Sequence, residues 1–127
     1  MQAVVLRYML AHAERPPRPA NAKDQPVVLA QARDYLRDHI SDPVSLDELA
    51  AVAGLGRFRL LRTFQRRFGV PPHSCQLQLK MERARTLLRR GLSAALVAGE
   101  LGFCDQSHFT RHFKQVLGVT PSEYVRR

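Results

Sequence analysis

The segment GFCDQSHFTRHFK, residues 102–114, with GVTP following at residues 118–121, decides the fold of this chain. It predicts a glycine turn, a capping residue and a short helix. Four apolar residues recur at helical spacing, and we expect them to point into a core: Phe109, Phe113, Val116 and Leu117. Ser107, Arg111 and Lys114 fall on the opposite side. A short helix that presents a cation, an amide and hydroxyl groups outward suits the major groove of DNA.

The same pattern occurs a second time, earlier in the chain. An offset of 49 residues relates Arg62-x-Phe64 and the Phe-Gly-Val at 68–70 to Arg111-x-Phe113 and the Leu-Gly-Val at 117–119. The first helix of each copy, which precedes these residues, matches at an offset of 48. The later copy therefore has one extra residue in the turn between its helices. Each copy predicts a helix-turn-helix unit. The repeat aligns the outward residues of the two copies, Phe58, Arg62 and Gln65 with Ser107, Arg111 and Lys114.

The remaining periodicity predicts an all-α fold of seven helices. We expect helices at about 27–40, 46–53, 57–68, 71–90, 94–101 and 106–117, and a short last helix after Thr120. Ser45 and Glu48 form a capping box before the second of these. The fourth helix, of about 18 residues, would be roughly 27 Å long and would join the two units. We expect the first helix-turn-helix unit at residues 45–69, the linker helix at 71–90 and the second helix-turn-helix unit at 93–118.

Apolar positions within these helices predict the core. In the first helix they are Val28, Ala32, Tyr35 and Leu36, in the third Leu60, Phe64 and Phe68, and in the linker helix Leu77, Met81, Ala84 and Leu88.

Residues 1–26 differ in character from the rest. Residues 1–13 have apolar residues at helical spacing, and four prolines between positions 15 and 26 predict a stiff, extended linker. We interpret residues 1–26 as the trailing end of an absent sensor domain. A dimer-forming helix within residues 1–14 and a frayed tail are the alternatives.

Charge and composition narrow the class of function. The formal net charge is +9, and the 20 basic residues comprise 17 Arg and 3 Lys. Arginine forms bidentate hydrogen bonds with phosphate and guanine, so nucleic acid is a natural partner, although a solvated basic surface is the alternative. The sequence contains no apolar run near the 20 residues that a membrane span needs. We therefore expect a cytoplasmic protein without a membrane partner.

No catalytic or cofactor site emerges from the residue spacing. The sequence has no nucleophile near a base at a recognisable spacing, no phosphate-binding loop and no carboxylate pair. Cys104, His108 and His112 stand four residues apart, a spacing that places metal ligands on one helical side, but no fourth ligand is evident. We expect neither an enzyme nor a bound metal or cofactor.

At this point the sequence resembles the DNA-binding domain of AraC/XylS-type transcriptional regulators, over about residues 27–127. The resemblance rests on the two repeats already quoted, above all residues 102–121 with Tyr124, and on Pro72-His73 with Glu82-Arg83-Ala84 in the linker helix. It implies seven helices, two helix-turn-helix units and sequence-specific binding to operator DNA by an activator or repressor. It also implies RNA polymerase as a partner. A homodimer through residues 1–14 or through an absent N-terminal domain is a further expectation, and its first form rests on the apolar pattern of residues 1–13.

Site residues are carried over by position. The resemblance implies base contacts from Phe58, Leu61 and Arg62 in the first reading helix, and from Gln106, Ser107, Thr110 and Arg111 in the second. The outward faces add Arg57, Arg59, Gln65 and Lys114 to the candidate DNA contacts. Positions 61 and 110 lie nearer the core in the helical pattern. One departure is Gly56, which stands where members of this family have serine or a similar capping residue.

Two other functions remain compatible with the sequence. One is a nucleic-acid-binding module that uses only its charge and is neutral to sequence. The other is a helical protein-interaction module whose basic face meets an acidic partner. A competition assay with unrelated duplex separates the first from a sequence-specific regulator, and light scattering with and without residues 1–25 tests the second.

Overall fold

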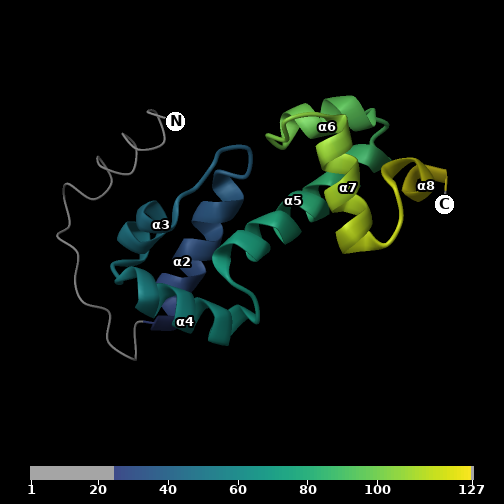
Figure 1. Cartoon of the computed structure of the whole chain (residues 1–127). Helices are drawn as coiled ribbons and strands as arrows, with labels where there is room; N and C mark the ends of the chain where they lie inside the picture. The colour runs from purple at the N-terminus through teal and green to yellow at the C-terminus, as the bar shows by residue number, and fades with distance from the viewer. Residues whose placement is uncertain (1–24, 127) are drawn as a thin grey trace. The chain divides into compact units, whose positions relative to one another are not determined.

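The computed structural model describes residues 25–126, and all regular structure in that range is helical (Figure 1). It confirms the predicted all-α fold with seven helices. These are α2 (Gln25–Asp38), α3 (Leu46–Ala53), α4 (Arg57–Phe68), α5 (Pro72–Arg89), α6 (Ala94–Glu100), α7 (Gln106–Leu117) and α8 (Pro121–Arg126). The predicted N-terminal helix and most of the proline linker lie outside the described residues.

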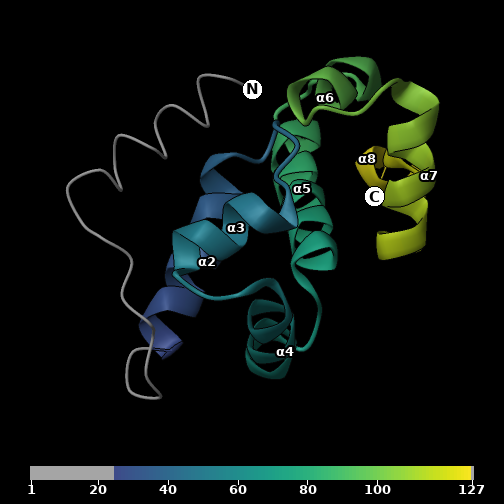
Figure 2. The same ribbon diagram turned by 60° about the vertical axis from the view of Figure 1, so that its left-hand side comes forward.

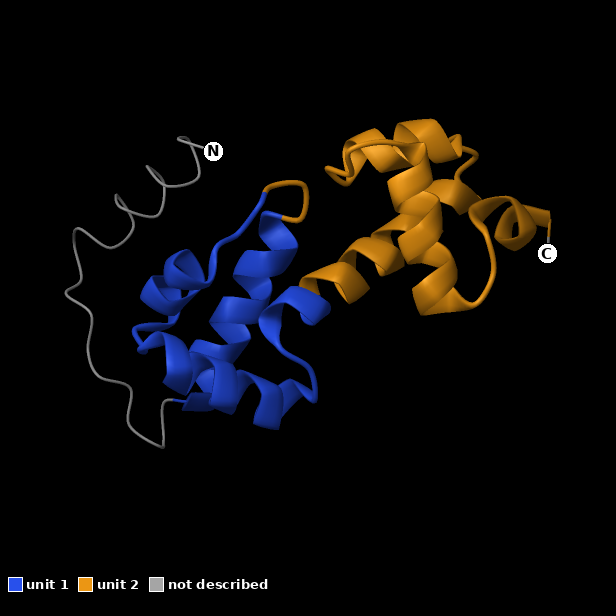
Figure 3. Ribbon diagram, viewed as in Figure 1, with its two compact units in different colours: residues 1–39, 43–75 blue, residues 40–42, 76–127 orange. Residues whose placement is uncertain are grey.

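The described chain divides into two compact units, coloured separately in Figure 3. Unit 1 contains residues 25–39 and 43–75, and unit 2 contains residues 40–42 and 76–126. Each unit contains one of the two helix-turn-helix segments, α3–α4 in unit 1 and α6–α7 in unit 2. Helix α5, with 18 residues, contributes its first turn to unit 1 and the remainder to unit 2.

Unit 1 is built around α2, which lies beside α3 in both Figure 1 and Figure 2 and also packs against α4. Its buried residues on α2 are Leu29, Ala32 and Leu36. Val28, which was predicted for this stripe, is half-buried, whereas Leu29, which was not predicted, is fully buried. Both positions fit a helical period, and only packing against neighbouring helices decides between them.

A polar contact also differs from the predicted capping box. Ser45 Oγ accepts a hydrogen bond from the Glu48 backbone N–H at 3.0 Å, as expected for an N-cap. The Glu48 carboxylate, however, accepts a hydrogen bond from the Tyr35 hydroxyl of α2. Glu48 therefore ties α3 to α2, and Tyr35, predicted as a core residue, is half-buried with its hydroxyl satisfied.

Unit 2 has a core formed by α5, α6 and α7. Phe109 and Phe113 of α7 are fully buried, as predicted, together with Met81, Ala84 and Leu88 of α5. Leu77 and Leu117 are half-buried and pack against this cluster. The prediction that Val116 points into the core was wrong. Its side chain is 41% exposed, because solvent reaches it in the last turn of α7.

Gly102 begins the turn between α6 and α7 and is required there for two reasons. Its φ is +78°, a conformation that residues with a Cβ seldom adopt. A Cβ at this position would also clash with the backbone carbonyl oxygen of Ser41, which belongs to the same unit. The turn of the second helix-turn-helix therefore lies close against the backbone of Ser41 and has no room for a side chain at Gly102.

Among residues 25–126, no helix combines the length and the apolarity that a membrane crossing requires.

Candidate nucleic-acid interface

Helix α4 separates into a buried side and an exposed side. Leu60 and Phe64 have no exposed surface, and Phe68, predicted as core, is half-buried beside Phe64 with ring centroids 4.7 Å apart. The candidate DNA contacts Phe58, Arg59, Arg62 and Gln65 are exposed. The candidate Leu61 is half-buried, as its position in the helical pattern suggested.

Phe58 is the most exposed large apolar side chain of α4, at 82%. At this exposure the ring gains little from folding, because most of its apolar surface stays in water. In a DNA major groove, an apolar side chain can contact the 5-methyl group of thymine. The exposure of Phe58 therefore suits a contact made only in a complex.

The start of α4 lacks a side-chain cap. Gly56 occupies the N-cap position with φ −69° and ψ 159°, and no side-chain hydrogen bond satisfies the first backbone N–H groups. The helix ends at Gly69, whose φ of +82° places it in the left-handed conformation and whose N–H donates to the Gln65 carbonyl.

Arg57 is partly engaged within unit 1. Its Nε lies 3.1 Å from Asp47 Oδ1 in the first turn of α3, and both side chains are exposed. An exposed pair of this kind contributes about 0–1 kcal/mol, so a phosphate can replace Asp47 as the partner of Arg57 at small cost. Sequence reasoning missed this pair, because it depends on how α3 crosses α4.

Helix α7 repeats the division seen in α4. Phe109 and Phe113 are buried with ring centroids 5.6 Å apart, while Gln106 is exposed in the first turn. The candidate contacts Ser107, Arg111 and Lys114 are also exposed, and Thr110 is half-buried. The structure thus brings the second set of candidate residues onto the solvent side of one helix.

The start of α7, unlike that of α4, is capped by a side chain. Asp105 Oδ1 accepts a hydrogen bond from the His108 backbone N–H at 2.8 Å. A carboxylate at this end also interacts favourably with the positive end of the helix dipole. Gly118, with φ +79°, ends the helix and donates its N–H to the Lys114 carbonyl.

His108 and His112 lie together on α7, with their Nε2 atoms 3.1 Å apart. Phe103 packs against both rings, with centroids 5.3 Å and 5.9 Å away. Lys80 Nζ lies over the Phe103 ring, 5.1 Å from its centroid. Burial lowers the pKa of the Lys80 ammonium group. Within the described part of the chain, no three His, Cys, Asp or Glu side chains converge as metal ligands.

Residues 49–127 match the family model described as a helix-turn-helix domain. The MmsAB operon regulatory protein of Pseudomonas aeruginosa is 34% identical over 94 residues, which are 73% of this chain and 31% of that protein. The first curated relatives are matched over 27–37% of their own length, so this chain spans well under half of each.

Solved structures share the fold. One is a transcriptional regulator from Chromobacterium violaceum, described among AraC-type DNA-binding domain-containing proteins. It is 31% identical with a TM-score of 0.75, over 84% of this chain and 95% of that one. The DNA-binding domain of AdpA, a global transcriptional factor solved in complex with a target DNA, is 27% identical. Its TM-score is 0.71, over 77% of this chain and 89% of that one.

Proposed function

The chain belongs to the AraC-type helix-turn-helix family, and on that premise we propose that it is a transcription regulator that recognises a specific double-stranded DNA sequence. The observation that carries the proposal is the matched pair α4 and α7. Each helix buries two aromatic or aliphatic residues and presents polar and basic side chains to solvent at the same spacing. A helix-turn-helix dimer presents two recognition helices, one from each chain, whereas this chain presents two by itself.

The two helices would enter successive major grooves on one face of the duplex. Those grooves repeat every 34 Å or so along the duplex. Because α4 and α7 differ in their exposed side chains, a single chain with one helix in each groove would read an asymmetric site.

Roles can be divided between the exposed side chains of the two helices. Arg62 and Arg111 are the proposed readers of guanine, because a guanidinium pairs with guanine O6 and N7. Gln106 and Ser107 would supply polar contacts in the second groove, with Thr110 at its edge, and Leu61 would lie at the edge of the first groove. Phosphate contacts would come from the remaining cations, which are Arg57, Arg59 and Lys114, with Gln65 beside them.

Partners beyond DNA are proposals of the same kind. RNA polymerase is the expected partner of a transcription regulator, and the named relatives are themselves regulators. A homodimer through residues 1–14 or a further domain, and a cytoplasmic location, remain predictions. Whether the chain activates transcription is tested by a reporter under the selected operator.

The test begins with selection of bound sequences from a random duplex library. Binding of the wild-type chain and of Arg111→Ala is then measured on the selected duplex and on a scrambled duplex of the same composition. We expect Arg111→Ala to weaken binding to the selected duplex by about 1–3 kcal/mol and to the scrambled duplex by much less.

The control variant is Arg37→Ala on α2, which removes the same unit of charge far from α7 in sequence. Arg37 is exposed and paired with Asp34 at 3.7 Å. We expect small and equal effects of this variant on both duplexes. Equal losses on both duplexes for Arg111→Ala, or no enrichment of any sequence, would contradict the proposal and favour a sequence-neutral module.

A further inference from the structure

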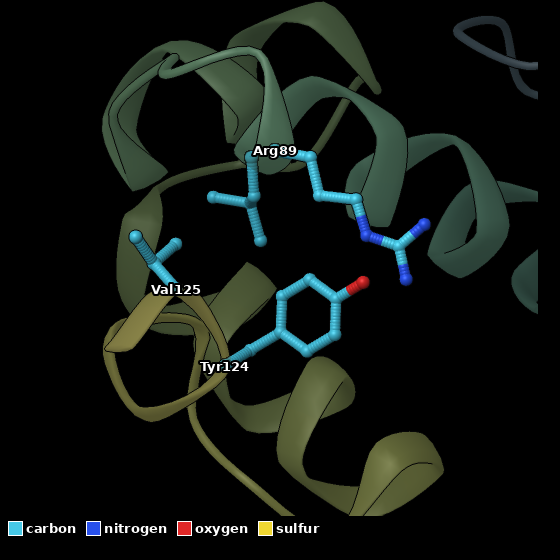
Figure 4. A pocket seen from close by; sticks show the side chains of 4 residues that line it. Arg89, Tyr124 and Val125 are labelled. Carbon is cyan, nitrogen blue, oxygen red and sulfur yellow. The ribbon is translucent and has the colours of Figure 1, made fainter. Parts of the chain in front are cut away.

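A cavity of about 450 Å³ lies in unit 2 between the end of α5 and helix α8 (Figure 4). Leu88 and Arg89 of α5 and Tyr124 and Val125 of α8 line it. Figure 4 shows the Arg89 side chain extending along the hydroxyl end of the Tyr124 ring, with Val125 on the other side of that ring. The cavity has no part in the DNA-binding proposal and can be tested separately from it.

The lining combines apolar surface with positive charge. Leu88 is buried, at 3% exposure, whereas Val125 is 57% exposed and leaves apolar surface in contact with water. The Arg89 guanidinium carbon lies 5.5 Å from the centre of the Tyr124 ring, and Arg85 donates a hydrogen bond from Nε to the Tyr124 hydroxyl at 3.4 Å. Neither arginine has a carboxylate partner among residues 25–126.

One lining residue, Tyr124, packs against the core side of α7. The Tyr124 ring packs edge-on against Phe113, with centroids 5.7 Å apart, and Phe113 is fully buried. Arg111, in contrast, lies on the exposed side of the same helix. A molecule in the cavity would therefore not occupy the surface on the exposed side of α7.

We propose that this cavity binds a small organic carboxylate with an apolar body. Ligand sites are commonly 300–1,000 Å³ in volume and are mostly apolar, with a few polar groups that fix the ligand's orientation. The apolar body would cover Leu88, Val125 and the part of the Tyr124 ring that the guanidinium groups of Arg85 and Arg89 leave open. The carboxylate would accept hydrogen bonds from Arg89, a charge-assisted pairing that two parallel N–H groups strengthen.

The test uses biphenyl-4-carboxylate and its neutral analogue biphenyl-4-carboxamide, titrated into the isotopically labelled full chain. We expect the carboxylate to shift the backbone resonances of Leu88, Tyr124 and Val125 with sub-millimolar affinity, and the carboxamide to bind at least tenfold more weakly. Acetate, which has the charge without the apolar body, should leave these resonances unchanged at the same concentration.

Two variants locate the site. Arg89→Gln should weaken binding of the carboxylate about tenfold, and Val125→Asp should abolish it, while both keep the wild-type circular dichroism spectrum. Arg90→Gln is the matched control, because Arg90 is an exposed neighbour outside the lining, and its affinity should change less than twofold. The proposal is overturned by any of three outcomes: no binding at millimolar carboxylate, shifts confined to other residues, or equal effects of Arg89→Gln and Arg90→Gln.

Discussion

At the scale of single residues, the two reading helices differ most at their N-caps. Gly56 gives α4 no side-chain cap, whereas Asp105 caps α7 through its carboxylate. The conformation of Gly56 lies in the extended region that any residue adopts, and a Cβ added there meets nothing within 4 Å. Glycine is therefore not required at this position by the backbone or by packing.

We predict that Gly56→Ser stabilises the protein by about 0.5–1 kcal/mol. The hydroxyl would accept a hydrogen bond from an N–H of the first turn, and the side chain would reduce the conformational freedom of the unfolded chain. Urea unfolding followed by circular dichroism measures the change.

Gly56→Ala separates these two contributions, because it restricts the backbone without providing an acceptor. We expect serine to be more stable than alanine by about 1 kcal/mol, and Asp105→Ala to destabilise the second unit by a similar amount. A serine variant no more stable than the alanine variant would show that the extended N-cap geometry of Gly56 is wrong.

At the scale of elements, two glycine turns test how α7 is held. Gly102 and Gly118 flank α7, with φ values of +78° and +79°. A Cβ on Gly118 meets no atom within 4 Å, whereas a Cβ on Gly102 meets the Ser41 carbonyl oxygen. A residue with a Cβ would therefore carry the same conformational strain at either position. The two positions differ only in the room that surrounds the Cβ.

We predict that Gly118→Ala costs about 1–2 kcal/mol, which is the cost of a left-handed conformation for a residue with a Cβ. Gly102→Ala should cost about 3 kcal/mol or more, because one backbone segment must also move away from the other. Thermal and urea unfolding of the two variants give the comparison. Equal destabilisation would mean that residues 40–42 do not approach the turn.

At the scale of the whole molecule, charge governs association. The formal net charge is +9, and five of the candidate DNA contacts are cationic: Arg57, Arg59, Arg62, Arg111 and Lys114. Long-range attraction to a polyanion follows from this balance whatever sequence the helices recognise. All five side chains are exposed to solvent, where a phosphate can reach them.

We predict a steep salt dependence for DNA binding. Each phosphate that a cation neutralises contributes about −0.9 to the slope of log K against log salt concentration, so the three proposed phosphate contacts, Arg57, Arg59 and Lys114, should give a slope of about −3. Fluorescence anisotropy from 50 to 300 mM salt measures it. Arg59→Ala should make the slope less steep by about 1, and a flat dependence would remove the electrostatic basis of the proposal.

Sequence periodicity was sufficient for the helices and for most of the buried side of each. Phe64, Phe109 and Phe113 are fully buried as expected, because a helix with apolar residues at spacings of four has one face that must leave water. It failed at Val116, where the helical period allows burial but the side chain is 41% exposed, and it missed the buried Leu29 beside the half-buried Val28. The DNA contacts themselves remain predictions.

By itself, the sequence determined the all-α class, the two helix-turn-helix units and the solvent-facing sets on α4 and α7, because these depend on local periodicity, caps and glycine turns. Only the tertiary structure decided the rest: the pairing of Arg57 with Asp47, the engagement of Glu48 by Tyr35, and the cavity beside Tyr124. Each of these joins residues from different helices. Periodicity places a side chain on a face of its own helix, but the packing of helices decides what that face meets.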